Sequence, residues 1–538
     1  MTHDLDLILA HMISRRAAET PHLDVLTFVE ILPDGSFAEE VRTYGQLWAN
    51  GLRMAEALIE ESGMNEGDKF ALIMQNHPEF IDAMVGSSIA NTVFVPIDPR
   101  TKGALLRYMI DYAECRGVVC ADYALAHLLD GVLAELPRIE WVWVIDTGLG
   151  LKLPEDRRFR WWRQALDRTA GHVVIRANNP AEPMQMLYTS GTTGNPKAIL
   201  APHARFGGVA QIGQLIGLTP ADRPYTGLSL THANAQLVTL GCTLKMGLRT
   251  VISRKFTKSR LWDITRRYGC TVFNLLGGMT MAIYSEPERP DDADNPVRYV
   301  LSAGMPAVIW EKFETRFGLQ VFEFYGLAEG GLTFNPPGHG PVGSVGKPPP
   351  NMLCTIRDDA DQECPDGEPG EICFRFVDGS LPAFSYFKNA EATGERLRDG
   401  WFRTGDIGRK DAEGWLYFEY RKGGGIRRNG DFVTAATVEK VIAEYPLIDD
   451  VFVYGLALPT NTPGEKEIVA AVRTADAAGF DPKDLMRHCK GQLPANFLPG
   501  FIQVVPEIPK TASEKPQERF LVEAFHNNPE QVHRMAAD

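Results

Sequence analysis

Apolar and polar positions follow two alternating patterns along the N-terminal part of this 538-residue chain. Short apolar runs, typical of buried strands, are followed by stretches with the periodicity of amphipathic helices. A polar N-terminal arm comes first, and a helical pattern opens at 43–47. The apolar runs lie at 70–74, 93–97, 117–120, 141–145, 250–253, 271–276, 298–302 and 319–324. We therefore predict an α/β fold with two doubly wound halves, whose mainly parallel sheets are covered by helices on both faces.

The pattern changes from Pro341 onward, where proline- and glycine-rich turns separate short strands of alternating polarity. These strands lie at 352–357, 371–376 and 415–419. They predict a small antiparallel β-barrel or sheet that belongs to the large N-terminal domain.

A run of glycines at 423–425 predicts a hinge, because glycine tolerates wide changes of φ and ψ. The chain beyond it has the pattern of a compact α+β unit. Its strands are expected at 451–456, 468–472 and 501–505, and its helices near 437–444 and 481–493. We predict an N-terminal domain over 1–421 and a smaller, mobile C-terminal domain over 422–538.

Composition argues against several kinds of partner. A net charge of -14 leaves no broad basic field for nucleic acid or an anionic membrane. The eight cysteines are scattered, without a CxxC pair, which favours reduced core residues in the cytosol. The start, MTHDLDLILAHMISRR, lacks the basic region of a signal peptide, and no window approaches 18 apolar residues. We expect a cytoplasmic protein with no nucleic-acid partner and no membrane span.

The segment MLYTSGTTGNPKAIL, at 186–200, has the features of an anion-binding loop after a strand. Glycine lets backbone amides approach a phosphate, hydroxyls donate hydrogen bonds, and lysine adds a positive charge. The residues with these features are Thr189, Ser190, Gly191, Thr192, Thr193, Gly194 and Lys197. Their spacing does not fit a Walker A motif. A flexible surface linker is the alternative, but the segment is short and apolar runs flank it.

YTSGTTGNPK resembles the phosphate-binding signature of the adenylate-forming superfamily, which includes acyl- and aryl-CoA ligases, peptide-synthetase adenylation domains and luciferases. The resemblance extends over nearly the whole chain. It implies that the protein binds ATP, Mg²⁺ and CoA, and that Thr192 and Glu329 lie at the metal.

The segment FYGLAE follows a predicted strand and resembles the superfamily's Tyr-Gly-x-Thr-Glu motif. The resemblance implies that Tyr325 and Gly326 contact adenine and that Glu329 binds Mg²⁺. Taken alone, the segment would fit a core aromatic residue and a turn equally well. Ala328 stands where the superfamily usually has a threonine that contacts the α-phosphate, a loss of about 1 kcal/mol if nothing replaces it.

Two further segments resemble nucleotide-binding motifs. LSAGMP contains the small residues Ala303 and Gly304, which the resemblance places along the adenine and acyl groups. WFRTGD ends at Asp406, whose carboxylate is expected in a glycine turn, where it accepts hydrogen bonds from the ribose hydroxyls. The resemblance implies Arg421 as a second ribose contact. Either segment alone would indicate only a turn.

The C-terminal part carries the implied hinge and CoA contacts. Gly423 stands at the pivot, where the superfamily has Asp or Lys, and Gly430 matches the glycine that lines the thiol path. Arg427 is a candidate for CoA phosphates, although exposed arginines are more often plain surface charge. The motif around Lys515 resembles Pro-x-Thr-x-x-x-Lys, which implies that this lysine neutralises charge during adenylation. An exposed lysine in a basic tail is the alternative.

The acid pocket is expected around LSLTHANAQ and FNLLGGM. The first segment lacks the aspartate that pairs with an α-ammonium in amino-acid adenylation domains, which argues against an amino-acid substrate. His232 has two equal interpretations, as a catalytic residue that orients the carboxylate or as a structural histidine. The other candidate lining residues are Asn234, Phe273, Asn274, Gly278 and Met305. An apolar wall with two asparagines suggests an aromatic or short polar acid.

We predict an AMP-forming carboxylic acid:CoA ligase that makes an acyl-adenylate from the acid and MgATP and then transfers the acyl group to CoA. A stand-alone adenylation enzyme that loads a carrier protein is one alternative. A ligase-like, non-catalytic nucleotide-binding protein is another, favoured by Ala328 and Gly423 and disfavoured by Glu329, Asp406 and Lys515. The sequence leaves a homodimer open.

Overall fold

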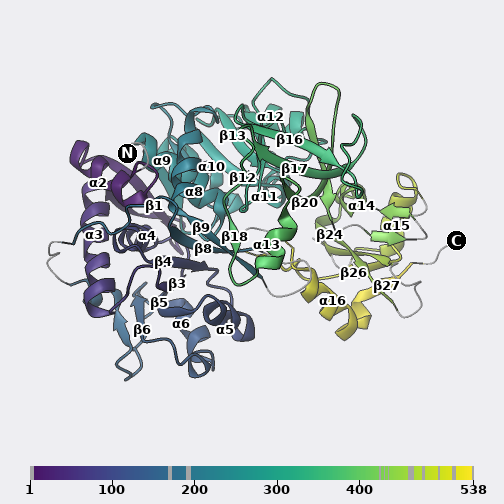
Figure 1. Cartoon of the computed structure of the whole chain (residues 1–538). Coiled ribbons are helices and arrows are strands. Elements are labelled where there is room, and N and C mark those ends of the chain that lie inside the picture. Colours follow the sequence, from purple (N-terminus) through teal and green to yellow (C-terminus); the bar gives the residue numbers. More distant parts are fainter. Residues whose placement is uncertain are drawn as a thin grey trace. The chain divides into compact units, whose positions relative to one another are not determined.

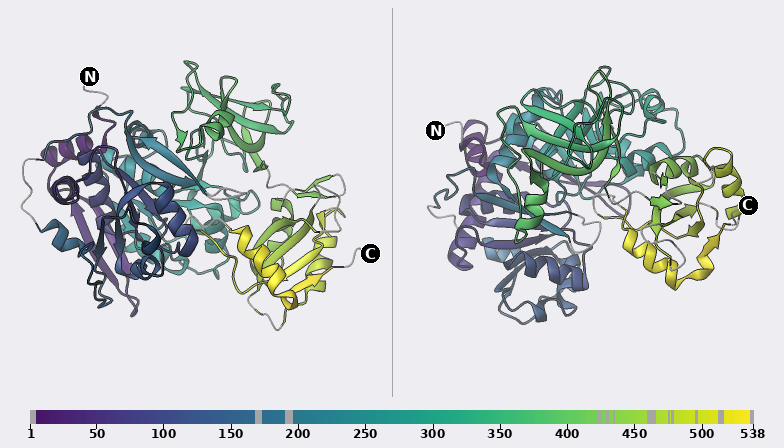
Figure 2. Two further views of the ribbon diagram at one scale, coloured as in Figure 1. Left: turned by 60° about the horizontal axis from the view of Figure 1, so that its bottom comes forward. Right: turned by 45° about the vertical axis from the view of Figure 1, so that its right-hand side comes forward.

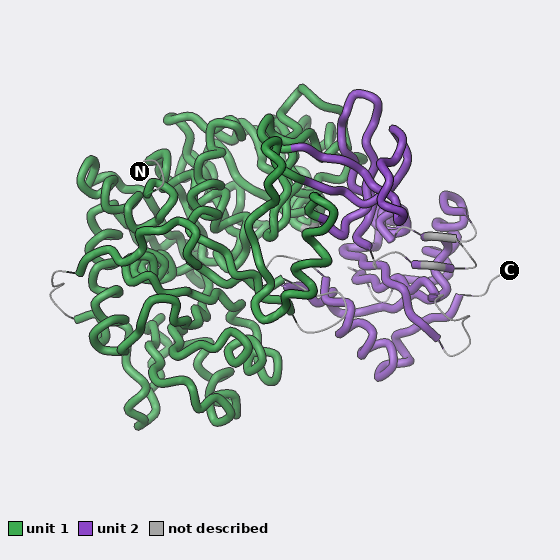
Figure 3. The backbone as a smooth tube through the Cα atoms, viewed as in Figure 1, with its two compact units in different colours: residues 1–352, 375–402 green, residues 353–374, 403–538 purple. Residues whose placement is uncertain are grey.

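The computed structural model of the protein describes residues 5–167, 173–189, 196–422, 426–428, 431–433, 435–458, 466–474, 476, 479–494, 497–511 and 516–535 (Figure 1). The chain divides into two compact units (Figure 3). Unit 1 comprises Met1–Met352 and Arg375–Phe402, and unit 2 comprises Leu353–Phe374 and Arg403–Asp538. A domain boundary at residue 421 stays a prediction.

The first of two eight-stranded sheets in unit 1 has the order β15-β14-β13-β12-β10-β11-β1-β2. Its strands are β1 (Asp24–Ile31), β2 (Phe37–Thr43), β10 (Pro224–Thr226), β11 (Thr250–Ser253), β12 (Val272–Leu276), β13 (Tyr299–Ala303), β14 (Gln320–Gly326) and β15 (Leu332–Asn335). The inner strands pair in parallel, and β2 and β15 are antiparallel edges. The four strands predicted between residues 250 and 324 are confirmed as β11 to β14.

The second sheet has the order β18-β9-β8-β4-β3-β5-β6-β7. Its strands are β3 (Lys69–Ile73), β4 (Val93–Ile97), β5 (Cys115–Ala121), β6 (Trp141–Ile145), β7 (Phe159–Trp161), β8 (Pro183–Thr189), β9 (Lys197–Pro202) and β18 (Ser385–Tyr386). Strands β3 to β8 pair in parallel, whereas β9 and β18 are antiparallel additions at one edge. The strands predicted between residues 70 and 145 are confirmed as β3 to β6.

Helices α3 (Tyr44–Glu56) and α4 (Pro78–Ala90) pack closely against each other. Nearly every residue of α4 is buried. A Cβ on Gly51 would lie 2.4 Å from the Val85 Cγ1 atom, and a Cβ on Gly86 would lie 2.4 Å from the Met54 Cβ atom. Glycine at these two positions therefore allows the two helices to approach closely.

The remaining helices of unit 1 complete the α/β layers (Figures 1 and 2). They are α2 (Leu9–Glu19), α5 (Gly103–Tyr112), α6 (Asp122–Leu129), α7 (Trp162–Leu166), α8 (His203–Ala210), α9 (Gly241–Met246), α10 (Leu261–Tyr268), α11 (Gly277–Tyr284), α12 (Trp310–Phe317) and α13 (Ala390–Arg396), with π-helical turns η1 (Ala57–Glu61) and η4 (Asn234–Leu240). Within the described residues, no helix is both long and apolar enough to span a membrane.

The prediction of a polar N-terminal arm is wrong. This segment forms α2, β1 and β2, and five consecutive residues of β1, from Val25 to Val29, are buried. Strand β1 pairs in parallel with β11, where Leu26 lies opposite Thr250. Acidic residues flank this apolar run, and its partner strand comes more than two hundred residues later in the chain. The pairing therefore had no local sequence signal.

A five-stranded sheet follows the path β16-β17-β20-β19, with β21 beside β20. Its strands are β16 (Met352–Arg357), β17 (Gly370–Phe376), β19 (Leu397–Arg398), β20 (Trp401–Lys410) and β21 (Leu416–Arg421). This is the small sheet predicted from the proline- and glycine-rich pattern. The sequence interpretation missed β20, the longest of the five strands.

The C-terminal part of unit 2 contains a short hairpin, β22 (Ile426–Arg428) and β23 (Asp431–Val433), and a four-stranded sheet of order β24-β25-β26-β27. The sheet strands are β24 (Ile448–Leu456), β25 (Glu467–Thr474), β26 (Phe501–Val504) and β27 (Val532–Arg534), and the helices are α14 (Ala435–Ala443), α15 (Pro482–Lys490) and α16 (Glu518–Asn527). Along β25, Ile468 and Ala470 pack with α14 and α15, and Val469 and Ala471 pack with α16. Successive residues thus face opposite sides, which confirms the predicted α+β unit.

Candidate active site

The predicted phosphate-binding segment joins two antiparallel strands of the second sheet. Thr189, the last residue of β8, lies opposite Lys197, the first residue of β9. The Thr189 hydroxyl donates a hydrogen bond to the Lys197 carbonyl over 3.3 Å. The Lys197 ammonium lies 5.1 Å from the centre of the Tyr386 ring, a cation–π distance.

Several predicted residues lie outside the described residues. They are Ser190, Gly191, Thr192, Thr193, Gly194, Gly423, Gly430 and Lys515. The backbone of Gly278 lies in α11 and that of Arg427 in β22. The roles assigned to all of these residues stay predictions.

Glu329 lies in the turn after β14 and is 8% exposed. The Tyr386 hydroxyl donates a hydrogen bond of 2.8 Å to its Oε1 atom. Within the described chain, its Oε2 atom has no hydrogen bond. A fixed carboxylate with one oxygen left over is the kind of hard ligand that Mg²⁺ takes, so the residues present fit the predicted metal.

The turn that carries Glu329 is held from two sides. The Arg205 Nη2 atom on α8 donates a hydrogen bond of 2.8 Å to the Leu327 carbonyl. Ala328, the departure from the superfamily motif, packs against a small cluster formed by Ile199, Tyr386 and Ala392. Alanine therefore suits this position structurally, because a threonine hydroxyl would be set among apolar neighbours.

Tyr325 and Gly326 end β14, where Tyr325 lies opposite Thr333 and Gly326 opposite Leu332 on β15. Tyr325 is partly exposed, unlike the buried Phe324 before it. This placement at the carboxyl end of a parallel strand agrees with the expectation for a ligand-contacting residue.

The Ala303–Gly304–Met305 segment leaves β13 in a strained turn and is anchored by a buried acid. Gly304 has φ 106°, which favours glycine, and a Cβ on Gly277 would lie 3.0 Å from the Gly304 carbonyl oxygen. The Glu323 carboxylate accepts hydrogen bonds from the backbone amides of Gly304, over 2.6 Å, and Met305, over 3.1 Å. Burial raises the pKa of Glu323 to about 7. Sequence reasoning missed Glu323, although an acid within the apolar strand VFEFYG was a signal.

Replacing Glu323 by glutamine should change the pH dependence of stability. The folded pKa of about 7 lies above the ordinary 4.5, so the stability that this group contributes is present below pH 4.5 and is lost as the pH rises through 7. Between pH 5 and pH 8 we expect the wild type to lose about 2 kcal/mol relative to Glu323→Gln. Urea unfolding of both proteins at the two pH values measures this difference. An equal change in both proteins would contradict the raised pKa.

Asp406 and Arg421, the predicted ribose contacts, lie in unit 2 and bind each other. Asp406 is 2% exposed and accepts hydrogen bonds from the Arg421 Nε atom, over 2.7 Å, and its Nη2 atom, over 3.3 Å. They are directly opposite across β20 and β21. The expectation that Asp406 lies in a turn is wrong, because β20 continues through this residue. Gly405, just before it, has φ 71° and also lies within β20. The Gly405 amide donates a hydrogen bond of 2.8 Å to Glu371, which orients this part of the strand.

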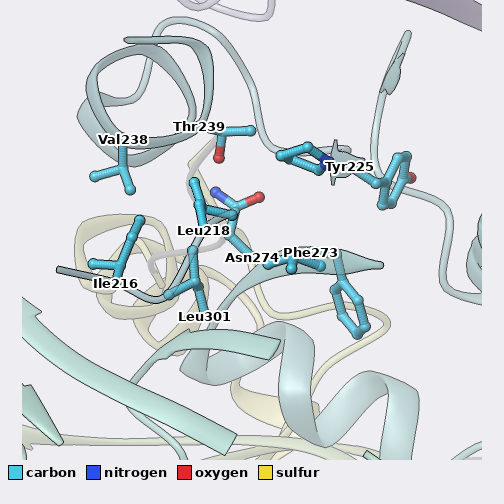
Figure 4. A pocket seen from close by; sticks show the side chains of 10 residues that line it. Ile216, Leu218, Tyr225, Val238, Thr239, Phe273, Asn274 and Leu301 are labelled. Atoms are coloured by element: carbon cyan, nitrogen blue, oxygen red, sulfur yellow. The ribbon is translucent and has the colours of Figure 1, made fainter. Parts of the chain in front are cut away.

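A small cavity lies against η4, β10, β12 and β13 (Figure 4). Its volume is about 10 Å³, which is room for about one water molecule. Among its lining residues are Ile216, Leu218, Val238, Phe273, Asn274 and Leu301. Phe273 and Asn274 were predicted for the acid pocket. His232, Asn234, Gly278 and Met305 do not line this cavity.

Asn274, which lines this cavity, forms a buried amide pair with Asn234. The Asn274 Nδ2 atom donates a hydrogen bond to the Asn234 Oδ1 atom. Asn274 is 3% exposed and Asn234 is 6% exposed. Among the residues described, the Asn274 Oδ1 and Asn234 Nδ2 atoms have no hydrogen-bond partner. Because buried polar groups are normally paired, these two atoms are an acceptor and a donor whose partners are not among the described residues.

His232 begins the segment that leads into η4. Its Nδ1 atom accepts a hydrogen bond of 3.2 Å from the Asn234 amide. In the neutral ring this places the proton on Nε2, which is then a donor. The catalytic and structural interpretations both remain compatible with this contact.

No group of three His, Cys, Asp or Glu side chains in the described part of the chain could hold a metal ion. Glu329 is therefore not part of such a group there.

Comparisons with known proteins agree over both units. A sequence profile of the AMP-binding enzyme family matches residues 13–377, and a profile of the AMP-binding enzyme C-terminal domain matches residues 437–515. The chain is 30% identical to a medium/long-chain-fatty-acid–CoA ligase of Mycobacterium marinum, over 90% of this chain and 92% of that protein. It is also 30% identical to a steroid-22-oyl-CoA synthetase of Rhodococcus jostii, over 84% of this chain and 81% of that protein.

Solved structures share the fold. The anthranilate CoA ligase AuaEII in complex with anthranoyl-AMP matches with a TM-score of 0.82 and 21% identity, over 97% of this chain and 98% of that chain. The o-succinylbenzoate CoA synthetase of Bacillus subtilis, in complex with its acyl-adenylate intermediate, matches with a TM-score of 0.77 and 22% identity, over 98% and 99%. At this level of identity the likeness concerns the fold alone.

Proposed function

Because the chain belongs to the AMP-binding enzyme family, we propose that it is an AMP-forming acid–CoA ligase whose substrate is an aromatic or short polar carboxylic acid. The acid attacks the α-phosphorus of ATP, giving acyl-adenylate and pyrophosphate. The CoA thiol then attacks the acyl carbon, which releases AMP and leaves the thioester. ATP, Mg²⁺ and CoA are the ligands of this reaction.

The residues divide this work as follows. The hairpin of β8 and β9 brings the hydroxyl- and glycine-rich segment and Lys197 to the phosphates. Glu329 holds Mg²⁺, which neutralises phosphate charge when bound. Asp406 and Arg421 bind the ribose, and Lys515 neutralises the charge that develops during adenylation. Gly423 is the pivot between the two steps, and Gly430 and Arg427 receive CoA.

One observation carries the proposal about the acid: on two of the elements that border the cavity, the Asn234 Nδ2 and Asn274 Oδ1 atoms have no hydrogen-bond partner among the described residues. The cavity itself holds about one water molecule, so the site would have to open for any acid, and least for a compact ring or short chain, whose polar substituent would pair with the free donor and acceptor. His232 and Met305 are assigned to the carboxylate end. Gly278 is assigned to the floor.

A medium- or long-chain fatty acid, or a steroid acid, is the second candidate. The relatives of 30% identity are named for such acids. A cavity of about 10 Å³ would have to enlarge more for their chains than for a compact acid.

An experiment distinguishes the two candidates: AMP release is measured in the presence of CoA with benzoate-like, short polar, medium-chain and long-chain acids. We expect the highest kcat/KM with a benzoate-like or short polar acid. A long-chain fatty acid used at least as well would overturn this choice of acid and support the second candidate.

The substitution Asn274→Leu sharpens this experiment. It keeps the branching at Cγ but removes the free acceptor together with the donor to Asn234, so kcat/KM should fall about 10-fold for the acid with the polar substituent and stay unchanged for the unsubstituted analogue. Thr239→Val, at the same cavity, is the matched control and should affect both acids alike. Equal losses for both acids in Asn274→Leu would contradict a role in recognising the substituent.

The thiol that accepts the acyl group and the cellular location are part of the proposal. CoA, rather than a carrier protein, is proposed as the thiol, and the enzyme is proposed to act in the cytoplasm. A comparison of CoA with a phosphopantetheinyl carrier protein as acceptor tests the first point.

A further inference from the structure

Tyr386 contacts two parts of the proposed site that come from distant parts of the sequence. Its hydroxyl donates to Glu329 Oε1 over 2.8 Å, and its ring lies 5.1 Å beneath the Lys197 ammonium. Tyr386 is 3% exposed, so both contacts are shielded from water. One side chain therefore touches the proposed metal ligand and the lysine of the phosphate segment.

The position of Tyr386 is fixed by its backbone. Strand β18 adds to the edge of the second sheet, where Tyr386 lies opposite Ile199 on β9. The Thr393 hydroxyl accepts a hydrogen bond of 2.9 Å from the Tyr386 amide. The Phe387 amide donates a hydrogen bond of 2.8 Å to the Ala198 carbonyl. The tyrosine ring is thus held by the same strand that begins with Lys197.

The hydrogen bond from Tyr386 fixes one oxygen of the Glu329 carboxylate. A carboxylate with one oxygen bound by a donor keeps its second oxygen pointing in one direction. Groups that orient a metal ligand in this way commonly change metal affinity by about 10- to 100-fold when removed. Ala328, which precedes Glu329 in the turn, has no hydroxyl that could take over this task.

We propose that Tyr386 is a positioning residue that orients Glu329 for Mg²⁺ and, through the same ring, supports Lys197 beside the phosphates. This rests on the proposed function, which makes Glu329 the magnesium ligand. A merely structural tyrosine would stabilise the fold without changing the magnesium dependence of nucleotide binding.

The test is the Mg²⁺ dependence of ATP binding, measured by calorimetry on the full chain. Tyr386→Phe keeps the ring above which Lys197 lies and removes only the hydroxyl. We expect the Mg²⁺ concentration needed for half-maximal ATP binding to rise about 10-fold. AMP binding in the presence of EDTA should stay within about twofold of the wild type, because it needs no metal.

Tyr112→Phe is the matched control, since the Tyr112 hydroxyl donates to the Phe387 carbonyl, next to Tyr386 in the chain, and does not touch Glu329. It should leave the Mg²⁺ dependence unchanged. A double-mutant cycle adds a second test, with Glu329→Gln and the double variant that combines it with Tyr386→Phe. If Tyr386 acts through Glu329, the second substitution should add no further rise.

Three outcomes would overturn the proposal. They are an unchanged Mg²⁺ dependence in Tyr386→Phe, an equal weakening of Mg²⁺-free AMP binding, or additive effects in the double variant. A wild-type protein whose ATP binding does not depend on Mg²⁺ would overturn the proposed function together with this inference, whereas the first three outcomes leave the proposed function intact.

Discussion

Replacing Lys515 by alanine is expected to lower the rate of acyl-adenylate formation by about 10²- to 10³-fold. Negative charge builds up on the carboxylate, the α-phosphate and the bridging oxygen in this step, and a positioned ammonium stabilises it. Thioester formation from supplied acyl-adenylate and CoA should be largely spared, because that step has a different charge distribution. Rapid-quench measurement of the two half-reactions separates the effects.

Lys510→Ala is the control for this variant. Lys510 lies in the same basic tail, but its ammonium pairs with Asp450, so its loss should leave both half-reactions unchanged. Equal losses in both half-reactions of Lys515→Ala would mean that Lys515 has another role.

The second large effect is expected for Asp406→Ala. If the carboxylate binds both ribose hydroxyls, its removal costs two charge-assisted hydrogen bonds of about 1.5 kcal/mol or more each, which raises the KM for ATP by about 10²-fold. The side chain of Arg421 is 40% exposed, so it can be hydrated after the loss of its partner, and stability should change little. Steady-state kinetics and thermal unfolding of the same preparation measure both quantities.

A substrate analogue provides the control for the ribose assignment. The wild type should prefer ATP over 2′-deoxy-ATP, and Asp406→Ala should lose this preference. An unchanged nucleotide dependence in the variant would show that Asp406 and Arg421 form only a structural pair.

Local patterns in the sequence were sufficient for most of the sheets. Strands β3 to β6 and β11 to β14 are mostly apolar runs, because both faces of a parallel sheet are covered. Strand β1 was missed because its pairing with β11 is non-local. Strand β20 was missed because Gly405 and Gly408 made it look like a turn.

The candidate site could be predicted only where a motif is contiguous. Tyr325, Gly326 and Glu329 come from one segment and lie together at the end of β14. The contacts that orient them come from elsewhere: Tyr386 is 57 residues from Glu329. The same holds for the amide pair, since Asn274 is 40 residues from Asn234. Such contacts depend on tertiary packing, for which a single sequence carries no local signal.

The most direct test of the central claim is to follow all products of ATP with the preferred acid, with and without CoA. The proposed mechanism predicts equal amounts of AMP, pyrophosphate and acyl-CoA when CoA is present, and only enzyme-bound acyl-adenylate with pyrophosphate when it is absent. Release of ADP and phosphate, or pyrophosphate formation that CoA does not accelerate, would contradict an AMP-forming acid–CoA ligase.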